Sequence, residues 1–340
     1  MLVFQVLLAG LSLLICTFAM PIGRALGVLD LPDGRRKLHA RATPLVGGIA
    51  VIVPVLLMAA WQAVTTDFTP LYTVLGGAIL SMTLLGMRDD RRHISASLRL
   101  GIECAIVLTA LFLVPGLRIE YLWLRFADTP LFLGAWGGML FTLICLVGLQ
   151  NAVNMADGKN GLVIGMALIW TMILSAYGPE HLSPVMIVLA LGLAVALAFN
   201  LRGLLFLGDG GTYGLSMLFG LLAIYTYNVG FPRLSADGII LLFFIPVIDV
   251  LRLMVVRVAQ RRSPFDSDRN HFHHILLAML PWHWALAVYL LLAAIPPLVA
   301  LYFPLATPHM VAGLLLIYVT LIAMRRWVVA KPATPVATSH

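Results

Sequence analysis

Charged residues are scarce in this chain: Asp, Glu, Lys and Arg make up 11% of its 340 residues, whereas 61% are hydrophobic. A soluble domain has a charged fraction near one quarter and an apolar fraction near one half. The composition therefore excludes a soluble domain and indicates a polytopic membrane protein. A long basic run is also absent, because the Lys and Arg residues behind the net charge of +7 are spread among short loops. This distribution argues against nucleic-acid binding.

Cysteine is nearly missing as well. The three cysteines, Cys16, Cys104 and Cys145, each lie within an apolar segment, and no Cys-x-x-Cys spacing occurs. They are predicted to be small core residues, neither paired in disulfides nor bound to a metal.

The first apolar segment lacks the basic residues that open a signal peptide, and the first positive charge, Arg24, follows it. This order predicts a retained span with the N-terminus outside. The chain also lacks internal repeats and the matched pair of interrupted apolar segments that is typical of an inverted-repeat transporter.

Apolar segments long enough to cross a bilayer recur along the chain. Lys and Arg concentrate in alternate loops, which places those loops in the cytoplasm. The predicted fold is an all-α polytopic integral membrane protein with about eleven transmembrane helices, its N-terminus outside and its C-terminus cytoplasmic. Residues 1–328 form one multi-span domain in this prediction, and residues 329–340 form a disordered cytoplasmic tail. The predicted spans are 2–20, 45–64, 70–87, 97–115, 131–150, 161–178, 183–200, 211–228, 237–257, 284–303 and 306–325.

Two adjacent carboxylates, Asp89 and Asp90, end the third apolar segment, with Arg88 before them and Arg91 after them. Neighbouring anions repel each other, so a pair at a membrane edge indicates a divalent cation or a shared proton. An ordinary hydrated cap is the alternative for a pair taken alone. Other acids, such as Asp157 and Asp209, occur in further Gly- or Asn-rich loops of the same face, and they favour the functional interpretation.

The loop from Asp30 to Gly48 combines Lys37 and His39 with a Thr43-Pro44 turn and a Gly pair. These residues suit a phosphate-bearing ligand. A topology signal followed by a tightly packed helix explains them equally well.

The segment from Asn151 to Leu162 places Asn151, Asn154, Asp157 and Asn160 between two apolar spans. Polar backbone breaks of this kind lie inside protein or line a cavity, because lipid offers no hydrogen bonds. Amide and carboxylate groups can bind ligand hydroxyls or metal-bound water. This segment is predicted to be functional.

The segment from Leu205 to Thr212 opens a helix with Phe206, Asp209 and three glycines. A glycine-rich helix N-terminus binds anions, and Asp209 is a natural metal ligand beside it. A helix-capping Asp is the competing explanation.

The longest cytoplasmic loop runs from Arg257 to His274 and contains Arg262, Asp268 and three histidines. His271 and His274 are spaced to share a helical face, with His273 beside them. Zinc is one interpretation, but no Cys accompanies these residues. Histidines that donate to phosphate are the favoured one.

These five segments, in this order and on one predicted face, resemble the polyprenyl-phosphate N-acetylhexosamine-1-phosphate transferase superfamily, glycosyltransferase family 4. The resemblance runs from about Asp30 to His274, and the Ser263-Pro264-Phe265 and His271-Phe272-His273-His274 marks are similar to the branch of UDP-GlcNAc:undecaprenyl-phosphate GlcNAc-1-phosphate transferases that begins surface glycans such as O-antigen. It implies transfer of a sugar 1-phosphate from a UDP-N-acetylhexosamine to undecaprenyl phosphate with release of UMP. Mg²⁺ or Mn²⁺, the lipid bilayer and a cytoplasmic site at a bacterial inner membrane are implied as well, and a homodimer is one candidate assembly.

The resemblance also implies roles for individual residues. Asp89 and Asp90 match the catalytic pair, and Asp209 and Asp157 match metal ligands. Phe206 is expected to stack on the uracil ring. The implied substrate-binding set is Lys37, His39, Asn151, Asn154, Asn160, Phe206, Arg262, Asp268, His271, His273 and His274.

Three positions depart from the family pattern. Asn160 stands where a second Asp is common, Thr212 where Ser is usual, and His93 where relatives often have another acid. Asn160 keeps an inactive relative open as an alternative to the transferase. The polytopic composition alone also suits a transporter or flippase for a lipid-linked or anionic solute. Glu103 is the main ionisable residue predicted inside a span, whereas a transport path expects several near the bilayer centre.

Overall fold

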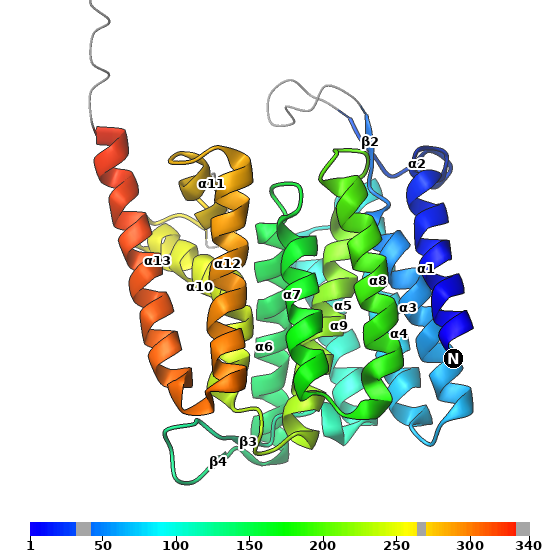
Figure 1. Cartoon of the computed structure of the whole chain (residues 1–340), viewed down its shortest axis with the longest axis horizontal. Helices are drawn as coiled ribbons and strands as arrows, with labels where there is room; N and C mark the ends of the chain where they lie inside the picture. The colour runs from blue at the N-terminus through cyan, green and yellow to red at the C-terminus, as the bar shows by residue number, and fades with distance from the viewer. Residues whose placement is uncertain (32–41, 264–269, 331–340) are drawn as a thin grey trace, which may run out of the picture.

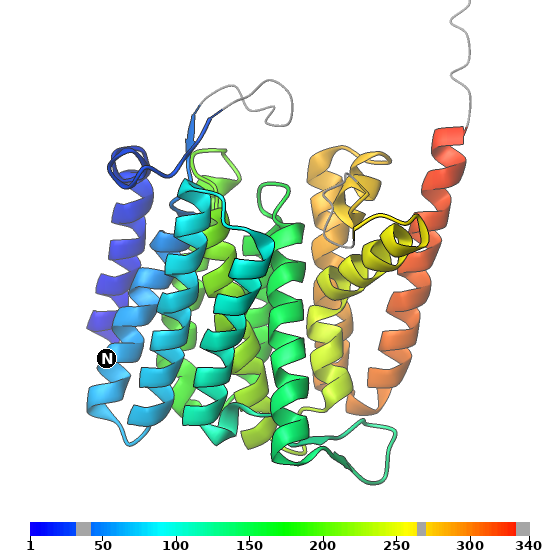
Figure 2. The same ribbon diagram turned by 180° about the vertical axis from the view of Figure 1, so that it is seen from behind.

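The computed structural model describes residues 1–31, 42–263 and 270–330. Within these residues the chain is almost entirely helical, with two very short antiparallel ladders, and it is an all-α polytopic membrane protein (Figures 1 and 2). The helices in chain order are α1 (Leu2–Thr17), α2 (Ala19–Leu26), α3 (Gly47–Thr65), α4 (Thr69–Arg91), α5 (Ala96–Leu113), α6 (Gly134–Ala156), α7 (Leu162–Tyr177), α8 (Ser183–Asn200), α9 (Gly208–Val229), α10 (Ala236–Ala259), α11 (Phe272–Leu277), α12 (Trp282–Tyr302) and α13 (Thr307–Ala330). The strands are β1 (Leu29–Asp30), β2 (Thr43–Pro44), β3 (Tyr121–Leu122) and β4 (Leu131–Phe132), and the short 3₁₀ turns are η1 (Pro115–Leu117), η2 (Glu180–Leu182) and η3 (Pro304–Ala306).

Each predicted span coincides with a helix of this structure, namely α1, α3 to α10, α12 and α13. Among the described residues, eight helices are long and apolar enough to cross a membrane, or up to nine if the bent pair α1 and α2 is one span. The break in that pair is 73°, and α7 is a shorter apolar helix. Of the predicted tail, residues 331–340 lie outside the described residues, while α13 continues through Ala330.

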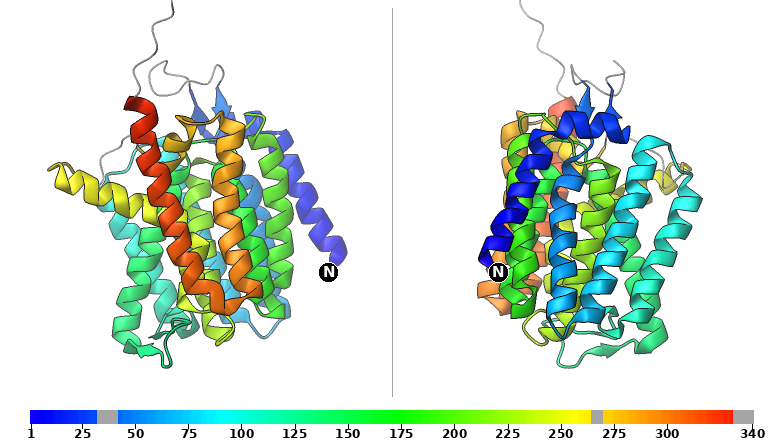
Figure 3. Two further views of the ribbon diagram at one scale, coloured as in Figure 1. Left: turned by 60° about the vertical axis from the view of Figure 1, so that its left-hand side comes forward. Right: turned by 90° about the vertical axis from the view of Figure 1, so that its right-hand side faces the viewer.

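Helix α9 lies at the centre of the bundle, and most of its side chains are buried (Figure 3). The helices that approach its first turns carry glycines at the contacts. A Cβ on Gly86 of α4 would lie 2.2 Å from the Asp209 carbonyl oxygen, and one on Gly48 of α3 would lie 2.2 Å from the Gly211 Cα. Glycine is therefore needed at these contacts, because a side chain would force the backbones apart. The close packing brings the C-terminal end of α4 to the N-terminal end of α9.

We call the end of the bundle where α4 ends and α9 begins the site end. The β1–β2 ladder and α11 lie at this end, whereas β3 and β4 lie at the opposite end (Figure 1). Helix α10 contains Pro246, and beyond it the helix projects away from the bundle (Figure 3). An internal proline removes a helix hydrogen bond and permits such a bend. The chain then returns to the site end at His271.

Candidate active site

Asp90 joins the end of α4 to the start of α9. Its Oδ1 accepts the backbone N–H of Asp209 at 3.0 Å, and its Oδ2 accepts that of Gly210 at 3.1 Å. These N–H groups have no partner within the helix, and the helix dipole favours an anion beside them. Gly208 precedes them with a φ of 75°, a conformation that favours glycine, so the chain can turn sharply into α9. Asp90 is thus a capping side chain supplied by a distant helix.

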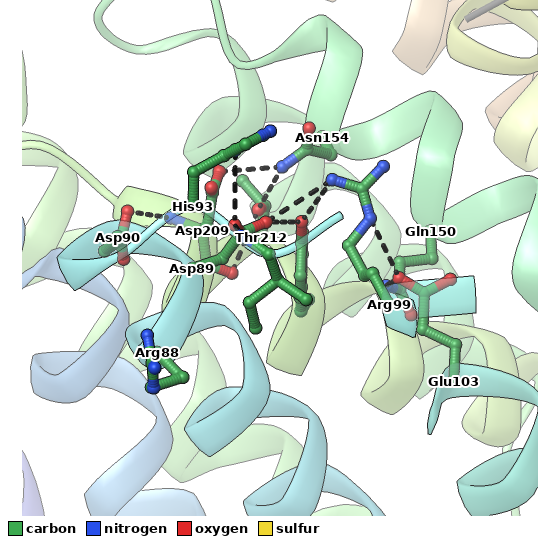
Figure 4. A network of polar contacts seen from close by, with 12 residues as sticks. Arg88, Asp89, Asp90, His93, Arg99, Glu103, Gln150, Asn154, Asp209 and Thr212 are labelled. Carbon is green, nitrogen blue, oxygen red and sulfur yellow. Dashed lines mark hydrogen bonds and ion pairs between the residues drawn. The ribbon is translucent and has the colours of Figure 1, made fainter. Parts of the chain in front are cut away.

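Asp209 is oriented by the neighbouring helix α6. The Asn154 amide donates to Asp209 Oδ1 at 2.9 Å and to the Thr212 hydroxyl at 3.2 Å (Figure 4). Both Asn154 and Asn151 lie in the last turns of α6, not in a loop as the sequence predicted, because α6 continues to Ala156. Asp89 and Asp90 likewise lie in the last turn of α4. The polar groups extend from helix ends, which fixes their directions more firmly than a loop would.

Asp157 follows directly after α6 and lies close enough to Asp209 and Asp90 to be affected by their charges. Although the side chain is accessible to solvent, the surrounding protein and the negative charges of Asp209 and Asp90 raise the pKa of its carboxyl to about 7. Asp157 thus lies near the carboxylates of Asp90 and Asp209 at the N-terminus of α9. Such a cluster attracts cations.

Asp89 points to the other side of α4 and is almost fully buried. Its Oδ1 accepts the Ile94 N–H at 2.7 Å, and its Oδ2 accepts the Tyr213 hydroxyl at 3.0 Å. Arg99 of α5 contacts the same Oδ2 at 3.4 Å and also donates to the Tyr213 hydroxyl at 3.0 Å. The two adjacent aspartates thus have different surroundings.

The first and fourth predicted segments run side by side at the site end. The N–H groups of Gly47 and Gly48 donate to the carbonyls of Phe206 and Leu207 at 2.9 and 3.0 Å, and the Phe206 N–H donates to the Pro44 carbonyl at 2.9 Å. The Gly pair was expected to admit a phosphate-bearing ligand. The structure instead uses these glycines for contact with α9, in agreement with the tightly packed helix that was the alternative. Phe206 is half-buried beside the site.

Asn200, the last residue of α8, connects the third and fourth segments. Its Oδ1 accepts the Gly161 N–H at 2.6 Å, and its Nδ2 donates to the Leu205 carbonyl at 3.0 Å. Gly161 has a φ of 84°, a conformation that favours glycine. Asn160 beside it accepts the Trp282 indole N–H at its backbone carbonyl, 3.2 Å away. Asn151 donates within its own helix, to the Val147 carbonyl at 2.9 Å.

The histidine segment is anchored by a buried carboxylate in α10. His271 Nδ1 and the Phe272 N–H contact Asp249 Oδ2 at 3.0 and 3.1 Å. Asp249 Oδ1 accepts from Arg252 at 2.7 Å and from the Tyr318 hydroxyl at 2.8 Å. The carboxylate is fully hydrogen-bonded, and the His271 Nδ1–H donated to it leaves Nε2 facing away.

The predicted pairing of His271 with His274 on one helical face is wrong. His271 precedes α11 in an extended conformation, so its ring stacks with that of His273 instead, with 5.7 Å between the ring centroids. His273 lies against Gly158, where a Cβ would be 2.5 Å from its Nε2. Burial, followed by the charges of His274 and His271, lowers the pKa of His273 to about 3. His273 is therefore neutral at physiological pH.

A metal site was predicted at Asp209 and Asp157. Within residues 1–31, 42–263 and 270–330, no three His, Cys, Asp or Glu side chains form a group that could hold a metal ion. This finding gives no support to zinc at the histidines. Mg²⁺ needs fewer protein ligands than zinc, because it is commonly held by one or two carboxylates together with water and substrate phosphates. The oxygen ligands around Asp209 fit that chemistry.

The other predicted site residues lie outside the described residues or at the surface. Lys37, His39 and Asp268 lie outside the described residues, and Arg262 is exposed after α10. Four residues with clear roles in this geometry were missed by sequence reasoning: Arg99, Asn200, Tyr213 and Asp249. Asp249 carried a usable signal, since a carboxylate inside an apolar span is costly unless paired. Arg99, Asn200 and Tyr213 had no such signal, because polar and aromatic residues are common near span ends.

Residues 72–227, which include Asp90, Asn154, Asp157 and Asp209, match the model of glycosyl transferase family 4. A probable undecaprenyl-phosphate N-acetylglucosaminyl 1-phosphate transferase of Bacillus subtilis is 26% identical over 272 residues, covering 78% of this chain and 74% of the relative.

Two further relatives are named undecaprenyl-phosphate alpha-N-acetylglucosaminyl 1-phosphate transferases. The one from Escherichia coli strain K12 is 27% identical over 76% of this chain and 72% of its own length. The one from Yersinia pestis is 28% identical over the same shares. The family match covers residues 72–227, which contain Asp90, Asp157 and Asp209, and the similarity to these three transferases extends over 76 to 78% of this chain.

Proposed function

We propose that this protein transfers a sugar 1-phosphate from a UDP-N-acetylhexosamine to undecaprenyl phosphate and releases UMP. One observation carries the proposal: Asp90 caps the first turn of α9, which contains Asp209, and Asp157 lies near enough to both for their charges to raise the pKa of its carboxyl. Both substrates are phosphate anions, and this arrangement offers them a helix N-terminus and a place for a divalent cation. The names of the relatives point to the same class of acceptor.

In the proposed site, Asp209 and Asp157 would hold Mg²⁺ or Mn²⁺, which supplies positive charge against the repulsion between the two phosphates. Asn154 orients Asp209, and Asp90 secures the turn that presents it. His273 offers a neutral ring nitrogen, and His271 is held in one orientation by Asp249. Phe206 is proposed to stack on uracil, and the remaining predicted binding residues to contact the donor.

The reaction is proposed to be a single displacement. An oxygen of the lipid phosphate attacks the β-phosphorus of the UDP-sugar, a new P–O bond forms, and the bond from the β-phosphorus to UMP breaks. UMP leaves with the electron pair of that bond, and the sugar 1-phosphate stays on the lipid. One residue of the Asp89-Asp90 pair would accept any proton that the lipid phosphate carries. A phospho-aspartyl intermediate is the rival route.

The finer assignments belong to the same proposal. The preferred sugar is N-acetylglucosamine, and the product would begin a surface glycan such as O-antigen. The site end would face the cytoplasm at a bacterial inner membrane, with eleven spans, the N-terminus outside and the C-terminus inside. Residues 1–328 would form one transferase domain, with a homodimer as the candidate assembly.

The transporter alternative predicts ionisable groups free to bind a solute inside the bundle. Glu103, the main residue of this kind, accepts from Gln150 at 2.5 Å and lies 3.6 Å from Arg99. Its pairing favours a structural role. The inactive-relative alternative rested on Asn160, but the carboxylate that faces Asp209 and Asp90 is Asp157.

The test is UMP release by the purified protein in detergent, with undecaprenyl phosphate, Mg²⁺ and a panel of UDP-N-acetylhexosamines. The expected result is UMP from one donor, dependent on lipid and metal, and a loss of about 100-fold or more in Asp209→Asn. Asp67→Asn, the same change at an exposed residue before the other end of α4, should retain full activity. Failure of every donor with folded wild-type protein and with Asn160→Asp would refute the proposal.

A further inference from the structure

The carboxylates of Asp89 and Asp90 differ in how many of their acceptor positions the protein already uses. An ionised carboxylate has about four lone-pair positions for hydrogen bonds. Those of Asp89 are occupied by the Ile94 N–H, the Tyr213 hydroxyl and Arg99, with His93 a further 3.6 Å contact. Asp90 accepts only the two backbone N–H groups of α9 among the described residues.

Asp89 also belongs to a polar network that connects four helices (Figure 4). Arg99 of α5 contacts Asp89 of α4 and Tyr213 of α9, and its Nε lies 3.6 Å from Glu103 Oε1. Gln150 of α6 donates to that same Glu103 oxygen. The Asp89 and Glu103 side chains are 3% and 1% exposed, so each depends on Arg99 for a charged partner.

A base in phosphoryl transfer must direct a free lone pair at the substrate oxygen within hydrogen-bond distance. Asp89 already accepts three hydrogen bonds, which leaves at most one such lone pair on a side chain that is 3% exposed. Asp90 accepts two hydrogen bonds and keeps free positions. The two neighbouring aspartates are therefore suited to different roles.

Resting on the proposed function, we propose that Asp89 is a positioning residue and takes no proton from the substrate. Arg99 and Tyr213 hold Asp89, Asp89 holds the turn at Ile94, and the end of α4 is thereby fixed so that Asp90 meets the first N–H groups of α9. Arg99 is a positioning residue of the same network, with Glu103 and Gln150 as its support. The reacting groups are then Asp90 and the residues around Asp209.

Removal of the paired charges together separates positioning from chemistry. Asp89→Asn removes one of the two acidic partners of Arg99, and Arg99→Gln leaves Asp89 and Glu103 buried without a charged partner; each is expected to lower kcat by about tenfold. The double variant Asp89→Asn/Arg99→Gln, made together with Glu103→Gln so that no buried carboxylate is left without its partner, is expected to recover kcat to within about threefold of wild type. Asp90→Asn is expected to lose about 100-fold, with no recovery when combined with Arg99→Gln.

The experiment measures kcat and both KM values per folded molecule, with thermal unfolding in detergent for every variant. A purely structural role would lower the unfolding temperature and leave kcat per folded molecule unchanged, and this outcome would overturn the proposal. A combined variant as inactive as a well-folded Asp89→Asn would also overturn it, because Asp89 would then act in the chemistry. Failure of the proposed function looks different: wild type itself would release no UMP from any donor.

Discussion

The Asp90 carboxylate accepts the backbone N–H of Asp209 at 3.0 Å, so the last turn of α4 caps the first turn of α9. A capping group normally belongs to the residue just before its helix. Here the cap comes from 119 residues earlier in the chain, and it places two of the three clustered carboxylates in a fixed relation. The geometry of the site thus depends on how closely α4 and α9 approach.

Gly86→Ala tests that approach. The added Cβ would lie 2.2 Å from the Asp209 carbonyl oxygen, which is backbone and cannot turn away. We expect a loss of about 1 to 3 kcal/mol in the free energy of unfolding. We also expect a fall in kcat, because the overlap pushes Asp209 away from Asp90. Thermal unfolding and UMP release measure the two effects. Gly77→Ala is the matched control in the same helix, because a Cβ there meets nothing within 4 Å; equal behaviour of the two variants would contradict the prediction.

The pKa of Asp157 predicts how stability depends on pH in the absence of metal. Its carboxyl has a pKa raised to about 7, whereas an Asp in the unfolded chain loses its proton near pH 4. Between these values the folded protein binds more protons than the unfolded protein, so this group makes stability fall as pH rises from about 4 to about 7. Melting temperatures in EDTA should therefore fall across this range by more in wild type than in Asp157→Asn. Mg²⁺ should reduce the difference between wild type and Asp157→Asn. Parallel pH curves for the two proteins would contradict the prediction.

Asp249→Asn tests the anchor of the histidine segment. An amide presents an N–H to a site where Arg252, Tyr318, His271 and the Phe272 N–H all donate, so at least one contact becomes unfavourable. We expect about 3 to 5 kcal/mol of destabilisation, together with a raised KM for the UDP-sugar in the protein that remains folded. Asp237→Asn is the control, since Asp237 is a buried carboxylate at the other end of α10. It should lower stability and leave both KM values unchanged.

Sequence reasoning predicted the helices well because each span needs about twenty apolar residues, and that requirement is local. It also predicted that Asp90, Asp157 and Asp209 are related, because polar residues between apolar spans are costly without a function. It could not predict contacts between helices that are far apart in the chain. Asn154 was assigned to a loop, since a helix whose last turn is polar looks like a loop in composition.

The role of the glycines shows the same limit. A Gly pair such as Gly47-Gly48 suits either a ligand or a neighbouring backbone, and the two uses are identical in sequence. Only the positions of α3 and α9 decide between them. Likewise, the adjacent Asp89 and Asp90 are chemically alike, and their difference comes from partners that other helices supply.

The contact between His273 and Gly158 gives a final prediction. A Cβ at position 158 would lie 2.5 Å from His273 Nε2, and His273 is only 2% exposed, so the ring must turn out of its place. If the neutral ring nitrogen binds a donor phosphate, Gly158→Ala should raise the KM for the UDP-sugar by about tenfold, the loss of roughly one hydrogen bond to a charged group. The KM for undecaprenyl phosphate should change little, and both KM values are measured on folded protein because moving a buried ring also lowers stability. Gly148→Ala, on α6 with nothing within 4 Å of the added Cβ, should match wild type, and an unchanged donor KM in Gly158→Ala would show that His273 does not bind the donor.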